Sequence, residues 1–82
     1  MSEERLKFLG RRGELEIERK SLEIRIKGLI DNLRDALDPL APVEDLEPEK
    51  IAEWSNALAE ARGKYRNVIA DLKKLEGILG RS

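Results

Sequence analysis

The chain contains no cysteine and no histidine, and only three of its 82 residues are aromatic. Without cysteine it cannot form a disulfide or a thiolate zinc site. Without histidine it lacks the commonest metal ligand and the side chain that most readily transfers protons near neutral pH. The usual nucleophile–base pairs of hydrolytic enzymes use these residue types. We therefore expect a non-enzymatic protein with no catalytic site, no metal site and no cofactor.

Long apolar runs are also missing. No stretch approaches the roughly 20 apolar residues that a membrane span needs, so we expect no membrane contact. The N-terminal residues Met1–Arg5 run directly into charge and form no apolar signal region. The formal net charge is −1, from 16 basic and 17 acidic residues, which argues against a protein that coats nucleic acid. We expect a cytoplasmic protein.

All three prolines lie close together, at Pro39, Pro42 and Pro48. Proline interrupts a helix because it lacks the backbone N–H and clashes with the preceding turn. The residues on either side are rich in Leu, Glu, Lys, Arg and Ala, which favour helix. The sequence therefore predicts an all-α fold with one helical-hairpin domain over residues 1–82. Its helices are expected at about 2–37 and about 48–79, joined by a proline-rich loop at about 38–47.

Apolar residues recur at alternating steps of three and four in the second predicted helix, which is typical of a coiled coil. This seam comprises Ile51, Trp54, Leu58, Ala61, Tyr65, Val68, Leu72, Leu75 and Leu79. The first predicted helix carries a matching seam, which Ile30 and Leu37 widen. Its residues are Phe8, Leu15, Leu22, Ile26, Leu29, Leu33, Ala36 and Leu40. Two such helices predict an antiparallel coiled-coil hairpin, with Trp54 and Tyr65 packed in its core.

Three arginines, Arg5, Arg12 and Arg19, occupy seam positions in the N-terminal half of the first helix. An unpaired buried charge costs several kcal/mol. We expect their aliphatic stems to pack while their guanidinium groups reach water or carboxylates. The alternative is that these arginines are offered to an anionic partner.

Residues 14–27 also alternate with period two, as a strand does. The intervening Arg19-Lys20-Ser21 is a poor hairpin turn, because it has no Gly or Asn. Glu16 with Lys20, and Glu23 with Lys27, are favourable pairs at helical spacing. We therefore predict helix here and keep a strand as the alternative.

In a helix, the same alternation places a second apolar stripe opposite the seam. Apolar residues on two faces indicate a contact beyond the hairpin, and glycines on the stripe permit close approach. The alternative is scattered surface aliphatic residues. The candidate oligomer interface consists of Leu6, Gly10, Gly13, Ile17, Ile24 and Gly28.

Charge is unevenly distributed. Between Asp31 and Glu53 eight acids face two bases, a net charge of −6, whereas the rest of the chain carries +5. Two hairpins lying antiparallel would bring each basic end beside an acidic loop, and complementary charge favours orientation. We therefore predict an antiparallel homodimer that forms a two-fold four-helix bundle. The alternative is a nucleic-acid-binding accessory protein with anion contacts at Arg5, Arg11, Arg12, Lys73 and Lys74.

The run from Gly28-Leu29-Ile30 through Ala36-Leu37-Asp38-Pro39, followed by a charged second helix, resembles small helical-hairpin proteins of Mu-like prophages. The resemblance covers most of the chain. It implies a phage accessory role without a defined activity or site. From the residues themselves we expect a protein–protein interaction or assembly module, built on a self-associating helical hairpin.

Overall fold

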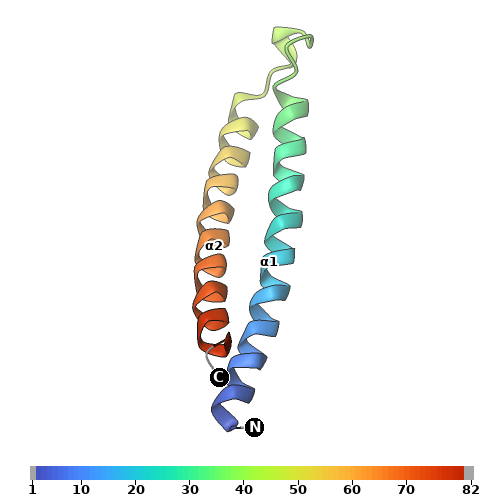
Figure 1. Cartoon of the computed structure of the whole chain (residues 1–82). Coiled ribbons are helices and arrows are strands. Elements are labelled where there is room, and N and C mark those ends of the chain that lie inside the picture. Colours follow the sequence, from blue (N-terminus) through green and yellow to red (C-terminus); the bar gives the residue numbers. More distant parts are fainter. Residues whose placement is uncertain (1, 81–82) are drawn as a thin grey trace.

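The computed structural model describes residues 2–80, and these residues form two long antiparallel helices (Figure 1). Helix α1 spans Glu3–Ala36 and helix α2 spans Pro48–Gly80, with a short 3₁₀ turn, η1, at Val43–Asp45 in the loop. The hairpin measures 63 × 15 × 14 Å. The predicted all-α architecture is confirmed, and a strand within residues 14–27 is wrong because α1 is continuous there. Positions 1, 81 and 82 of the predicted domain lie outside the described residues.

The helix ends follow from local chemistry. The Ser2 side chain caps α1 by accepting a hydrogen bond from the backbone N–H of Arg5, 3.2 Å away. Helix α1 ends before Asp38, whose position ahead of Pro39 disfavours helical backbone. The Asp38 carboxylate accepts a hydrogen bond from the Leu40 N–H at 2.9 Å and holds the first turn of the loop. Pro48 begins α2, where its missing N–H costs nothing.

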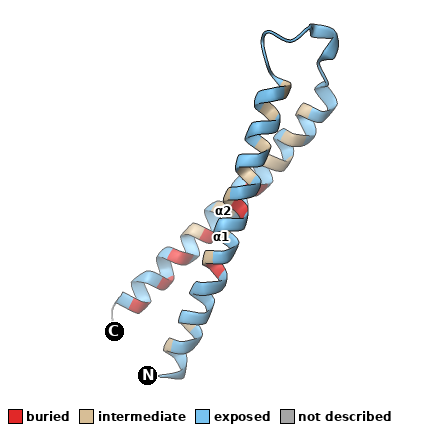
Figure 2. Ribbon diagram, turned by 90° about the vertical axis from the view of Figure 1, so that its right-hand side faces the viewer, coloured by how far each residue is buried: buried red, intermediate tan, exposed pale blue. Residues whose placement is uncertain are grey.

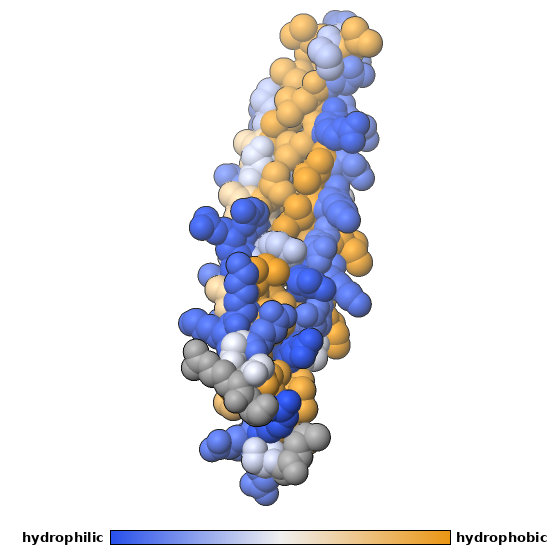
Figure 3. All heavy atoms as spheres, in the orientation of Figure 1, coloured by the Kyte–Doolittle hydropathy of each residue, from blue (hydrophilic) through white to orange (hydrophobic). Residues whose placement is uncertain are grey.

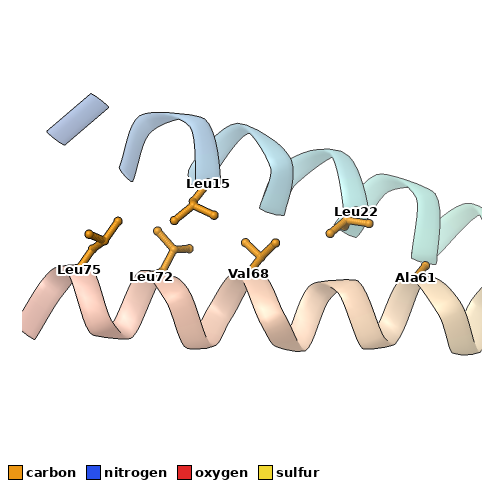
Figure 4. Packing of buried hydrophobic residues seen from close by; sticks show 6 residues of the cluster. All are labelled: Leu15, Leu22, Ala61, Val68, Leu72 and Leu75. Atoms are coloured by element: carbon orange, nitrogen blue, oxygen red, sulfur yellow. The ribbon is translucent and has the colours of Figure 1, made fainter. Parts of the chain in front are cut away.

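The buried core is small and lies between the middle of the hairpin and its open end (Figure 2). Leu15 and Leu22 project from α1 towards α2 (Figure 4). Phe8, Ile26, Tyr65 and Ile69 are half-buried against this cluster. The buried side chains are those of Leu15, Leu22, Ala61, Val68, Leu72, Leu75 and Leu79.

The seam is less buried in the half nearest the loop. Leu29 and Leu33 of α1, and Ile51, Trp54 and Leu58 of α2, are only half-buried. The prediction that the whole seam forms a core is therefore correct only for the half nearest the chain ends. Leu40, which the sequence places on the seam, lies beyond the end of α1 and is 91% exposed. A pair of helices covers each seam side chain from one direction, and large side chains such as that of Trp54 keep an open flank.

Candidate interaction surfaces

The predicted second stripe is exposed on α1. Ile17 and Ile24 each have 73% of their surface exposed, and Leu6 has 55%. At 100° per residue, Ile17 and Ile24 project roughly 160° and 180° away from Leu15. Because Leu15 faces α2, the two isoleucines lie on the opposite side of α1, which we call the back face. Figure 4 shows Leu15 pointing towards α2, which leaves the back face without a partner inside the hairpin.

Nothing inside the hairpin requires glycine at the glycine positions of this face. A Cβ atom placed at Gly10, Gly13 or Gly28 would meet no atom within 4 Å. None of these glycines has a positive φ. Each costs about 1 kcal/mol relative to alanine in a helix interior. They leave bare backbone beside the exposed isoleucines, and this would let another helix approach closely.

The predicted anion contacts lie at the open end but do not form one free cluster. Arg5 is half-buried and donates a hydrogen bond to the carbonyl oxygen of Leu79, 3.3 Å away. Arg11 pairs with Glu14 at 3.3 Å. Arg12, Lys73 and Lys74 are exposed. Acids at Glu3, Glu4, Asp71 and Glu76 dilute the positive charge here, so residues 3–12 and 71–80 together carry only +2.

The three seam arginines behave differently from one another. Arg19 is half-buried, and its guanidinium lies 2.7 Å from the Glu16 carboxylate and 3.7 Å from that of Glu23. This agrees with packed stems and paired heads. Arg12 is exposed, however, and does not pack on the seam. A straight helix drifts about 20° per heptad from a seven-residue repeat, so the three arginines do not project in one direction. Arg5 nevertheless reaches α2 through its hydrogen bond to the carbonyl oxygen of Leu79.

An open groove of about 340 Å³ lies near the loop, and Trp54 and Lys50 line it with the carboxylates of Asp35, Asp45 and Glu47. The Lys50 ammonium lies 2.9 Å from the Glu47 carboxylate. This hydrogen bond, with the charge of Glu47, raises the pKa of Lys50 above its ordinary 10.5. A lysine nucleophile needs a lowered pKa, so the groove favours no covalent chemistry at Lys50.

One apolar surface was not predicted to stay uncovered, and we call it the open seam. It comprises Ile30 and Leu37 of α1, which are 41% and 57% exposed, together with the half-buried seam residues Leu33 and Trp54. Figure 3 shows an apolar band between the helices in the half nearest the loop. The sequence indicates that Ile30 and Leu37 widen the seam, but a heptad pattern does not tell whether a two-helix seam is fully covered.

Other types of site find no support in the described chain. Across residues 2–80, no group of three or more acidic side chains is arranged to hold a metal ion. Neither described helix has an apolar stretch that could cross a membrane. Comparison with protein-family models, curated proteins and solved structures finds no match.

Proposed function

We propose that the protein is a non-enzymatic assembly module whose hairpin self-associates through the back face of α1. The observation that carries this proposal is the exposure of Ile17 and Ile24, at 73% each, beside glycines with open space around them. Large aliphatic side chains gain stability when they leave water, at roughly 25 cal/mol per Å². A second copy of the chain offers the same surface and would cover both isoleucines.

The small core supports the same proposal. Seven side chains are buried within residues 2–80, and all of them lie on one seam. Small domains without disulfides or metals are commonly stabilised by oligomerisation, and this chain has no cysteine. A dimer through the back face would place the two α1 helices at its centre and the two α2 helices outside. The four helices of the dimer would then lie side by side in one layer, in the order α2, α1, α1, α2.

Sedimentation equilibrium across a range of protein concentrations tests the proposal. We expect a monomer–dimer equilibrium for the native chain and a monomer for I17E/I24E, with helicity retained by circular dichroism. The matched control is L40E/V43E, which changes two loop residues that are 91% and 86% exposed. We expect the control to dimerise normally. A native chain that stays monomeric at hundreds of micromolar would overturn the proposal.

Nucleic-acid binding is the competing function, and salt separates the two. Phosphate contacts release counterions, so that binding weakens steeply as salt rises. Association through isoleucines should change little over the same range. A role as an accessory protein of a Mu-like phage stays a prediction that rests on the sequence resemblance alone.

A further inference from the structure

We infer that the back face of α1 encodes one antiparallel register, with a two-fold axis between Lys20 and Ser21. This inference deepens the proposed self-association and rests on it. Its basis is a palindrome in the exposed face: Gly13, Ile17, Ile24 and Gly28 are separated by four, seven and four residues. In an antiparallel two-fold contact, a surface packs against the same surface running in the opposite direction. A palindromic spacing brings like residues together in such a contact.

The register places like residues opposite one another. With a two-fold axis between positions 20 and 21, each residue lies at the same height along the helix as one residue of the second copy. The numbers of these two residues add up to 41. Ile17 is then level with Ile24 of the second copy, and Gly13 is level with Gly28. The open space at both glycines allows the backbones to approach beside each isoleucine pair. Packed helices lie 8–10 Å apart depending on the side chains between them, and glycine favours the short end of that range.

Charges at the edge of the face favour the same orientation. Glu14 and Arg25 are both exposed, and they project about 20° apart along one edge of the back face. The two-fold axis keeps that edge on the same side in both copies. Arg25 of the second copy then lies level with residue 16, about 3 Å along the axis from Glu14. The two-fold axis generates a second, identical Glu14–Arg25 pair. In a parallel dimer the same edge would lie on opposite sides of the two copies, so Glu14 and Arg25 would not meet.

The area available indicates a weak dimer. Helix α1 has 34 residues, so it is about 50 Å long, and one face is about 10 Å wide. Each copy could therefore cover roughly 500 Å², and the pair about 1,000 Å², at the low end for specific interfaces. We expect a concentration-dependent homodimer.

Disulfide trapping tests the register directly, because every introduced cysteine is the only thiol in its chain. A disulfide needs Cα atoms about 4.4–6.8 Å apart. We expect S21C to cross-link with itself, since this position flanks the two-fold axis. We expect G13C and G28C to form a mixed disulfide when combined. Each should fail alone, because its two copies would lie about 22 Å apart along the axis. The products are read on non-reducing gels and by mass spectrometry.

Ser55→Cys is the control, because Ser55 is exposed on α2 and away from the back face. It sets the level of random cross-linking. Self-linked G13C would show a parallel dimer, and a dimeric S21C that does not cross-link would show a different register. Both results overturn this inference and leave the assembly proposal standing. A monomeric native chain in sedimentation overturns both.

Discussion

The guanidinium of Arg5 donates a hydrogen bond from Nη1 to the carbonyl oxygen of Leu79, 3.3 Å away, and joins the first turn of α1 to the last turn of α2. The final carbonyls of a helix have no partner inside the helix, and cations are favoured there. The contact closes the open end of the hairpin. It also involves Arg5, which the sequence analysis predicted as an anion contact.

Replacing Arg5 by alanine should therefore destabilise the hairpin. We expect a loss of about 1 kcal/mol, the scale of a partly exposed hydrogen bond from a charged donor. Urea unfolding followed by circular dichroism measures the change. The matched control is R12A, because Arg12 is exposed one heptad further along α1, and its change should stay within about 0.5 kcal/mol. Equal losses in the two variants would contradict a specific role for the Arg5 contact.

The core should depend most on Leu15, which is 1% exposed and packs in the cluster with Val68, Leu72 and Leu75. Leucine-to-alanine changes at buried sites cost about 2–5 kcal/mol. A hairpin with one seam has little stability to lose, so we expect L15A to lose most of its helicity at 25 °C. L40A, at a position that is 91% exposed, should unfold at the native temperature. Circular dichroism melting at fixed concentration measures both variants.

Charge reversal at the edge of the back face should weaken and then restore dimerisation. E14R would place arginine beside Arg25 of the second copy, and R25E would place glutamate beside Glu14. Exposed ion pairs contribute about 0.2–1 kcal/mol each, and the pair occurs twice. We expect each single variant to raise the dimer dissociation constant several-fold to about tenfold.

The double variant E14R/R25E exchanges the two signs and should return the dissociation constant to near its native value. Sedimentation at low salt measures all three variants, since salt screens exposed pairs. Because Glu14 also pairs with Arg11 inside the hairpin, circular dichroism must show equal helicity in each variant. Additive weakening in the double variant would argue that Glu14 and Arg25 do not meet in the dimer.

Trp54 reports which face is used. It is the only tryptophan, and it is half-buried in the groove near the loop. A dimer through the back face leaves the open seam in water, so the emission maximum of Trp54 should not move as concentration rises through the dissociation constant. A blue shift that accompanies dimer formation would show that the open seam, rather than the back face, is covered.

The hairpin itself was predictable because its signals are local. The prolines from Pro39 to Pro48 exclude a continuous helix, Ser2 caps the first helix, and the alternating three- and four-residue steps identify the seam. The helix ends lie within about one residue of the prediction, because capping and proline chemistry act over only a few residues. The exposure of Ile17 and Ile24 likewise follows from helical periodicity alone.

The remaining features depend on how two helices meet in space. The sequence placed Arg5, Arg12 and Arg19 on one seam, but their surroundings differ. Arg19 pairs with two carboxylates, whereas Arg5 bonds to a carbonyl of α2 and Arg12 is exposed. Whether Leu33 and Trp54 would be covered depends on the flanks of the helix pair, which heptad positions do not describe. The contact of Arg5 with Leu79 spans 74 residues and has no local signature.

The loop tip presents Leu40 and Val43 at 91% and 86% exposure, at the far end of a rod 63 Å long. In the proposed dimer the axis lies near the middle of α1, about two-fifths of the way along each rod. The two tips would then point in opposite directions, about 75 Å apart. Such a particle would hold two identical tips a fixed distance apart. Weak adhesion at one tip would be reinforced wherever a target repeats at a matching distance.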